Sequence, residues 1–288
     1  MTKISPNPEK TLKIPRIIIL TGKIIAFFSP KLATLYAAKL FTTPIKHKTP
    51  KRELEMDRNS TQQLVQIPAV DKQVNVYHYG KNNPKILLVH GWSGRGTQLV
   101  KIADELVKAG YSTISFDAPA HGKSPGNSTI MVDFIASILE LEKQFGPFEA
   151  AIGHSLGGMS VLNSVKSGLK INRLAIIGSG DVVQDIIDDF IAKLELKSSI
   201  ATSLRLHFEK KYGGSMDDYS AYKAATEITI PAVIVHDEND YEVPVKAGIH
   251  IHKHLKNSEI ILTKGLGHRK ILGDQKVVDK VVQFILNN

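Results

Sequence analysis

The sequence predicts a doubly wound α/β fold: a mostly parallel sheet of about eight strands, with a helical cap insertion and an N-terminal helical arm. Short continuous apolar runs recur between residues 86 and 262, separated by stretches of helical length, which is typical of strands buried on both faces. Two alternating runs precede them, as in an antiparallel hairpin. A chain of 288 residues with 42% hydrophobic content is long enough to bury such a core.

The first 60 residues differ in charge from the rest. They hold 12 Lys and Arg residues against 4 Asp and Glu, so the remaining chain is nearly neutral. Lysines interrupt the apolar pieces between residues 17 and 41, and Ser29-Pro30 divides them. This pattern predicts two short helices rather than a transmembrane span or a cleavable signal peptide. Residues 14–41 either form a basic amphipathic segment that contacts a membrane or covers the active site, or pack as helices against the body.

Polar residues 46–63 predict a linker, so the arm is assigned to residues 1–60 and an α/β domain to residues 61–288. Alternation at 64–67 and 74–77 predicts the hairpin. Buried strands are expected at 86–89, 112–116, 150–152, 174–177, 232–235 and 260–262, with helices at about 97–109, 129–145, 156–168, 245–256 and 275–286. Residues 181–226 interrupt this rhythm and predict a small helical cap, in which Phe190 and Phe208 would line a substrate pocket.

The pentapeptide 153–157, Gly-His-Ser-Leu-Gly, lies between an apolar run and a predicted helix, which is the context of a nucleophile elbow. In such an elbow Ser155 occupies a strained turn, and the flanking glycines let the strand and the helix approach closely. Ser155 would also stand at a helix N-terminus, where Leu156 N–H can stabilise a developing negative charge. A glycine-rich turn without catalytic meaning is the alternative.

Ser155, Asp240 and His268 each follow a predicted strand, and the carboxyl ends of parallel strands meet at one edge of a sheet. Their order along the chain resembles that of the α/β-hydrolase superfamily, and the resemblance covers residues 62–288. It implies that Ser155 is the nucleophile, that His268 is the general base and then the general acid, and that Asp240 orients the imidazole. Asp237 lies in the same loop as an alternative acid. The Asp-x-x-Val-Pro spacing favours Asp240.

Residues 90–92, His-Gly-Trp, follow the strand at 86–89 and resemble the oxyanion loop of the same superfamily. The resemblance implies Trp92 N–H as a second donor beside Leu156 N–H, with the Trp92 ring as a wall of the acyl site. The alternative is a simple turn. Just beyond, Arg95 either contacts an acidic group of the substrate or lies on the surface. His121 resembles an anchor of a structural turn.

Several classes of function are not expected. The chain has no cysteine, which excludes disulfides, thiolate metal sites and cysteine nucleophiles. A nearly neutral body disfavours nucleic-acid binding. His250 and His254 share a helix face, but no carboxylate stands at matching spacing, so no metal is predicted. No glycine pattern indicates a nucleotide, so no cofactor is expected. We expect a cytoplasmic location, either free or peripheral on the inner face of the membrane.

The sequence thus predicts a cofactor-free serine hydrolase, similar to carboxylesterases and lipases, which cleaves a small-molecule or lipid ester through an acyl-enzyme. Thioester, lactone and carbon–carbon bond hydrolysis are alternatives for the scissile bond. A catalytically silent binding protein on the same fold is the alternative of another class.

Overall fold

A computed structural model describes residues 14–287. Its single sheet contains eight strands in the order β1-β2-β4-β3-β5-β6-β7-β8. The strands are β1 (Thr61–Ile67), β2 (Lys72–Tyr79), β3 (Lys85–Val89), β4 (Ser112–Asp117), β5 (Ala150–His154), β6 (Arg173–Ile177), β7 (Ala232–Asp237) and β8 (Ser258–Thr263). β1 pairs antiparallel with β2, and β2 pairs antiparallel with β4. All later pairs are parallel, so the predicted fold class is confirmed.

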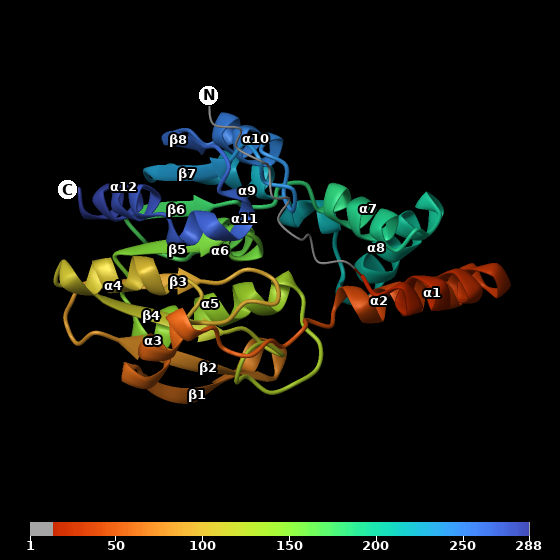
Figure 1. Cartoon of the computed structure of the whole chain (residues 1–288), viewed down its shortest axis with the longest axis horizontal. Coiled ribbons are helices and arrows are strands. Elements are labelled where there is room, and N and C mark those ends of the chain that lie inside the picture. Colours follow the sequence, from red (N-terminus) through yellow and green to blue (C-terminus); the bar gives the residue numbers. More distant parts are fainter. Residues whose placement is uncertain (1–13, 288) are drawn as a thin grey trace, which may run out of the picture.

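Helices cover both faces of the sheet (Figure 1). They are α4 (Val100–Lys108), α5 (Met131–Phe145), α6 (Leu156–Lys166), α10 (Lys246–His254), α11 (Gly267–Lys270) and α12 (Gln275–Leu286). Successive side chains of β3 point to opposite faces: Leu87 and Val89 join the core with α5 and α6, while Ile86 and Leu88 join the core with α4 and α12. Both faces of the strand are therefore buried, which explains its continuous apolar run.

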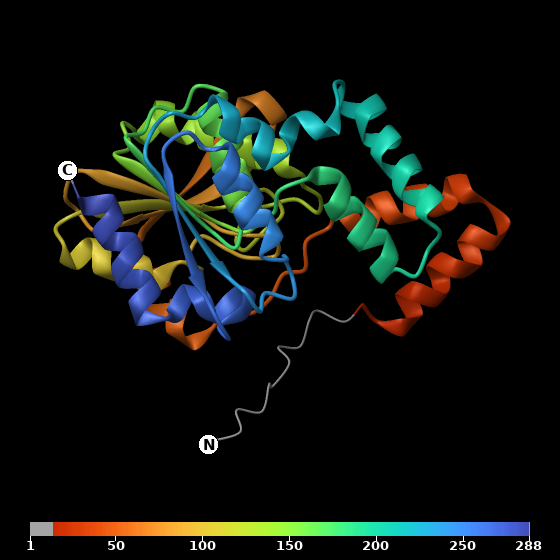
Figure 2. The same cartoon turned by 90° about the horizontal axis from the view of Figure 1, so that it is seen from above.

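Between β6 and β7 the chain forms α7 (Val183–Lys193), α8 (Ser198–Tyr212), the 3-10 helix η3 (Met216–Tyr219) and α9 (Ala221–Glu227). Before the sheet it forms α1 (Arg16–Phe28) and α2 (Pro30–Phe41), which meet at Ser29. Ser29 caps α2 by accepting a hydrogen bond from Leu32 N–H through its hydroxyl. Figures 1 and 2 show α1 and α2 beside α7 and α8, at one end of the molecule.

The segment expected as a linker is structured. It contains the 3-10 helix η1 (Lys51–Glu53), the helix α3 (Leu54–Asn59) and the first residues of β1. Glu53 and Met56 are buried there, and Met56 joins the core beneath α4. Because the residues around them are charged, composition alone predicts a linker here and does not indicate this packing.

Candidate active site

Ser155 joins β5 to α6 in a strained conformation. Its φ of 54° and ψ of −121° lie in a region that non-glycine residues rarely adopt, at a cost of about 1–3 kcal/mol. The flanking glycines make this turn possible. A Cβ on Gly153 would stand 2.5 Å from the Gly157 carbonyl oxygen, and one on Gly157 would stand 2.4 Å from the Val89 carbonyl oxygen. Strand and helix can therefore approach only with glycine at both positions.

His268 and Asp240 form a buried pair, and the His268 ring packs on that of His154, the residue before Ser155. His268 Nδ1 donates a hydrogen bond of 2.7 Å to Asp240 Oδ2, and the two residues are 4% and 6% exposed. The other carboxylate oxygen, Oδ1, accepts hydrogen bonds from the amides of Glu242 at 2.9 Å and Val243 at 2.8 Å. Because the proton of neutral His268 is held on Nδ1, the lone pair lies on Nε2. His268 lies in the short helix α11 rather than in the expected loop.

Asp237 has a different role from Asp240. Its carboxylate accepts hydrogen bonds from Thr263 Oγ1 at 2.7 Å and from backbone amides that include Asn239 and Leu266. Burial raises the pKa of Asp237, but the Thr263 hydroxyl and the backbone amides outweigh it, so the pKa lies below the usual value. Asp237 thus ties the end of β7 to the segment after β8, and of the two acids only Asp240 contacts His268.

Two further histidines hold this pair in place. His154 Nε2 donates to the His268 carbonyl oxygen at 2.9 Å, and the two rings lie 4.6 Å apart. His236 Nε2 donates to the Val243 carbonyl oxygen at 2.9 Å and lies 3.6 Å from Asp240 Oδ2. Burial lowers the pKa of both His154 and His236 below the usual value, so both are neutral near pH 7. They position the backbone of the segments that carry His268 and Asp240.

The loop after β3 lies directly against Ser155, since a Cβ on Gly91 would stand 2.8 Å from Ser155 Cβ. The amide of Gly91 donates to Gln98 Oε1 at 2.9 Å, and the amide of Ser93 donates to His121 Nε2 at 3.0 Å. Between them, Trp92 N–H has no hydrogen-bond partner among residues 14–287. Leu156 N–H is the first amide of α6 and has no partner within that helix. Two backbone donors thus occur near Ser155, one in the residue after it and one in the residue after Gly91.

Buried side chains anchor this loop. His90 Nε2 accepts a hydrogen bond from Ala118 N–H at 3.0 Å, so neutral His90 carries its proton on Nδ1 and donates to the Gly91 carbonyl oxygen. Burial lowers the pKa of His121 to about 4, which keeps its ring neutral and able to accept from Ser93. Asp117 accepts from the Gly96 amide at 2.7 Å and links the loop to the turn that follows β4.

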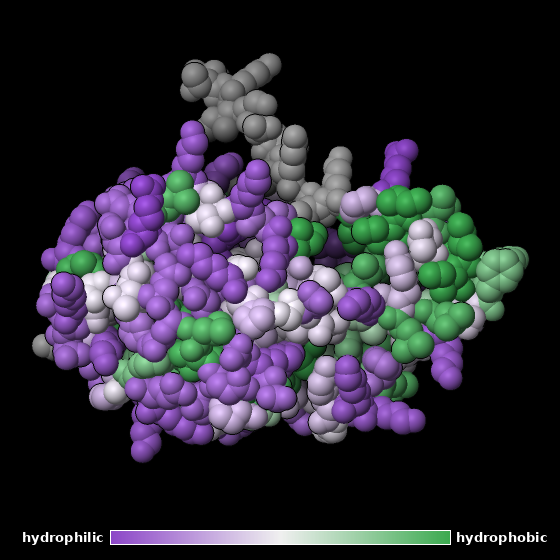
Figure 3. Space-filling model, turned by 90° about the horizontal axis from the view of Figure 1, so that it is seen from below, coloured by the Kyte–Doolittle hydropathy of each residue, from purple (hydrophilic) through white to green (hydrophobic). Residues whose placement is uncertain are grey.

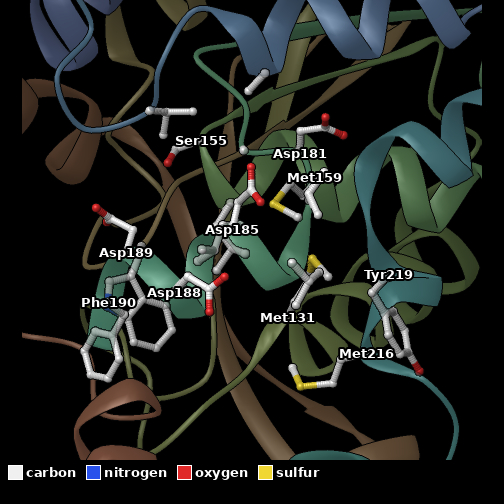
Figure 4. Close-up of a pocket in the computed structure, with 18 of the residues that line it drawn as sticks. Met131, Ser155, Met159, Asp181, Asp185, Asp188, Asp189, Phe190, Met216 and Tyr219 are labelled. Atoms are coloured by element: carbon white, nitrogen blue, oxygen red, sulfur yellow. The ribbon is translucent and has the colours of Figure 1, made fainter. Parts of the chain in front are cut away.

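A cavity of about 970 Å³ opens above Ser155, bounded by the edge of the sheet, α7, α8 and the end of α2. Its lining includes Leu40, Phe41, Trp92, Ser155, Phe190 and Phe208. Figure 4 shows Ser155 at one side of the residues that line this space, which also include Met131, Met159 and Met216. The lining also contains acidic residues of α7, and two of them form ion pairs, Asp185 with Lys246 and Asp189 with Lys193. The cavity is large enough for a long apolar group.

Comparison with known proteins identifies the fold family. A family model described as the alpha/beta hydrolase family matches residues 86–227, which include Ser155. An esterase from Exiguobacterium antarcticum has a similar structure, with 16% sequence identity and a TM-score of 0.63, over 79% of this chain and 100% of that chain. The chain belongs to the α/β-hydrolase superfamily. No curated protein matches its sequence.

Other solved structures similar to this α/β-hydrolase differ in their described activities. One is a bromoperoxidase from Bacillus anthracis, with 18% identity and a TM-score of 0.61, over 79% of this chain and 100% of that chain. Another is a membrane phospholipase A described as a bacterial virulence factor, with 14% identity and a TM-score of 0.63, over 95% of this chain and 97% of that chain. The last match extends into residues 1–60. At these identities the likeness shows the fold alone.

The structure corrects the expectation for Arg95 in this α/β-hydrolase. Arg95 is 8% exposed and does not line the cavity. Its guanidinium donates to Thr49 Oγ1 at 3.0 Å and lies 3.6 Å from Glu53 Oε2. Arg95 therefore neither contacts a substrate group at the pocket mouth nor lies on the surface. It fastens the segment before β1 to the loop after β3, whereas Trp92, Phe190 and Phe208 do line the cavity.

Sequence reasoning named no individual residue of two groups that line the cavity, although covering of the active site was one alternative for the arm. Leu40 and Phe41 come from the arm, and the Phe41 ring lies 5.1 Å from the Phe190 ring. Asp181 pairs with His250 Nδ1 at 2.5 Å, and burial raises the pKa of this carboxyl above its usual value. No local pattern links such distant partners. The spacing of His250 and His254 gives no sign of the pair with Asp181, and no cluster of metal-ligating groups occurs in the described range 14–287.

Proposed function

We propose that this α/β-hydrolase is a serine hydrolase that cleaves a carboxylic ester through an acyl-enzyme on Ser155. The observation that carries the proposal is the buried pair of His268 and Asp240, joined at 2.7 Å. The His268 ring packs on His154, the residue before Ser155, and Ser155 lines the apolar cavity. A neutral hydroxyl becomes a useful nucleophile when a nearby base accepts its proton, and an imidazole can do this near neutral pH.

Acylation begins when Ser155 Oγ attacks the ester carbonyl and His268 Nε2 takes the hydroxyl proton. The carbonyl oxygen becomes an oxyanion, which accepts hydrogen bonds from the amides of Trp92 and Leu156. Asp240 stays ionised and stabilises the imidazolium through Nδ1. The carbon–oxygen bond to the alcohol then breaks, and His268 gives its proton to the departing alkoxide.

Deacylation repeats these steps with water. His268 Nε2 takes a proton from the water as its oxygen attacks the acyl carbon, and the same two amides hold the new oxyanion. The bond to Ser155 Oγ breaks, the proton returns to the serine, and a carboxylic acid leaves. The sum is ester plus water giving acid plus alcohol, and it needs no cofactor.

An ester is favoured over an amide because an alkoxide leaves with less help from an acid. The apolar aromatic residues of the cavity suit the acyl group of such an ester. The esterase and the membrane phospholipase A that share the fold are consistent with this choice. Thioesters and lactones would follow the same steps with another leaving group.

Hydrolysis of p-nitrophenyl esters from acetate to palmitate tests the proposal. We expect Ser155→Ala to lower kcat by at least about 10³-fold. Ser164→Ala is a matched control, because Ser164 lies on the same helix and only donates back to the Ser160 carbonyl oxygen at 2.7 Å. Unchanged activity in Ser155→Ala would reject the proposal. The native chain should also react with a fluorophosphonate, and a chain that neither hydrolyses nor reacts would be a silent binding protein.

A further inference from the structure

Helices α1 and α2 form a hairpin whose inner side packs on the cap helices. Ala33, Ala37 and Ala38 are buried, and these small side chains let α2 lie close to α8. Tyr36 OH donates to the Ile18 carbonyl oxygen at 3.0 Å and joins the two helices of the hairpin. Lys23 pairs with Glu195 at the junction of α7 and α8. The hairpin thus packs against the cap helices through its inner side (Figure 2).

The outer side of the hairpin is apolar and exposed. Seven of the fourteen large hydrophobic residues that are exposed in the described part of the chain lie on these two helices, and they form the exposed apolar face: Ile17, Leu20, Ile24, Phe27, Phe28, Leu32 and Leu35. Phe27 and Phe28, at the tip, are 84% and 78% exposed. Figure 3 shows apolar surface gathered at this end of the molecule. Such a patch indicates a binding surface.

The charge of the hairpin indicates what covers this face. Residues 16–41 contain four basic residues, Arg16, Lys23, Lys31 and Lys39, and no acidic residue. Within the described range 14–287, Lys31 and Lys39 form no ion pair. Aromatic and aliphatic side chains beside unpaired lysines are typical of helices that lie in the interface of an anionic bilayer.

The length of the helices fits a position on the bilayer rather than across it. Thirteen residues of α1 extend about 20 Å, against about 30 Å for the hydrocarbon core. Within residues 14–287 none of the helices has the length and hydropathy that crossing a membrane requires.

The same hairpin reaches the cavity. The last two residues of α2, Leu40 and Phe41, line it, and the Phe41 ring lies 5.7 Å from the Phe208 ring. One helix therefore carries Leu32 and Leu35 on the exposed apolar face and, one to two turns later, part of the cavity wall. A bilayer that covers the outer side would bring its acyl chains to the entrance of the site.

We propose that the exposed apolar face docks on an anionic lipid bilayer, and that the substrate is an acyl ester of a membrane lipid whose chain enters past Leu40 and Phe41. The substrate class rests on the ester hydrolysis proposed above, whereas docking does not. A protein partner or a second copy of this chain on the same face is another outcome of the test.

Sedimentation of the full chain with vesicles tests the docking. The vesicles contain phosphatidylcholine and phosphatidylglycerol in a 7:3 ratio, with pure phosphatidylcholine as the neutral reference. Moving one phenyl group into an apolar medium favours binding roughly tenfold, so Phe27→Ser with Phe28→Ser should weaken binding at least about tenfold. The control carries Leu64→Ser and Leu262→Ser, since these residues are 53% and 44% exposed on β1 and β8, and should bind as the native chain does.

Two hydrolysis assays separate the substrate class from the chemistry. All three proteins should hydrolyse p-nitrophenyl butyrate equally, while the Phe27 and Phe28 variant should release far less fatty acid from vesicle phosphatidylglycerol. Soluble ester hydrolysis without lipid hydrolysis in the native chain would overturn the substrate class. Vesicle binding that is equal in all three proteins would overturn docking, as would a dimer in light scattering that depends on Phe27 and Phe28. If the native chain binds vesicles but hydrolyses neither the soluble ester nor the lipid, the proposed ester hydrolysis is rejected and docking remains supported.

Discussion

Replacing Asp240 with asparagine should prevent His268 from acting as a base, because it moves the imidazole proton from Nδ1 to Nε2. Oδ1 of Asp240 accepts two backbone hydrogen bonds, from Glu242 and Val243. In Asp240→Asn the side-chain carbonyl must take this position, because an NH2 group there would face two donors. The NH2 group then points at His268 Nδ1, which lay 2.7 Å from Oδ2, and donates to it. His268 must hold its proton on Nε2 and can no longer accept one from Ser155.

The expected loss in kcat is about 10³ to 10⁴-fold, or about 4–5.5 kcal/mol of transition-state stabilisation. Thermal unfolding should change little, because the two backbone hydrogen bonds are retained. The assay is the rate of p-nitrophenyl butyrate hydrolysis at saturating substrate. Asp237→Asn is the matched comparison, because it places an NH2 group opposite the N–H and O–H groups that donate to Asp237. This change should lower the free energy of unfolding by about 1–3 kcal/mol and lower kcat only slightly. A decrease of less than tenfold in Asp240→Asn would refute the reasoning, as would a folded Asp237→Asn with the larger loss.

Three further predictions follow from single contacts. Gly157→Ala would place a Cβ 2.4 Å from the Val89 carbonyl oxygen and should lower stability in chemical denaturation by about 3 kcal/mol, whereas Gly273→Ala, with open space around it, should not. Burial lowers the pKa of His121 from 6.5 to about 4, so its neutral form stabilises the fold above pH 6.5 and this stability is lost as the pH falls toward 4. His121→Gln should therefore reduce the loss of stability between pH 7.5 and 5 by about 2 kcal/mol; an unchanged pH dependence would contradict this assignment. Phe41→Ala should lower kcat/KM for p-nitrophenyl dodecanoate about tenfold relative to the acetate, and equal effects on both esters would exclude Phe41 from the acyl site.

The fold class could be predicted because burial on both faces of a strand leaves a local mark. The run at 86–89 is apolar at every position, since α4 and α12 cover one side of β3 while α5 and α6 cover the other. The strained turn at Ser155 could be predicted equally well, because it demands glycines two residues before and two residues after the serine. In both cases the physical cause lies within a few residues of the signal.

Contacts between distant segments were not predictable in this way. Arg95 meets Glu53 across 42 positions. A charged side chain is normally solvated or faces a ligand, so neither residue's type indicates a buried ion pair. Phe41 meets Phe190 and Phe208 from the opposite half of the chain, so the arm could not be assigned to the cavity from its apolar pattern. The choice between Asp237 and Asp240 also depends on hydrogen bonds that only the folded loop displays.

The loop after β3 has a consequence for how this site can vary. The donor at position 92 is a main-chain amide. Hydrogen bonds of the two neighbouring amides, to Gln98 on one side and to His121 on the other, set its direction. Any residue except proline at this position would keep the donor, because no side chain supplies it. In the mechanism proposed above, exchange of the indole ring would reshape the cavity and keep the donor, provided that His121, on which the ring packs, holds its place. Substrate preference and catalytic power would then be separable at this residue.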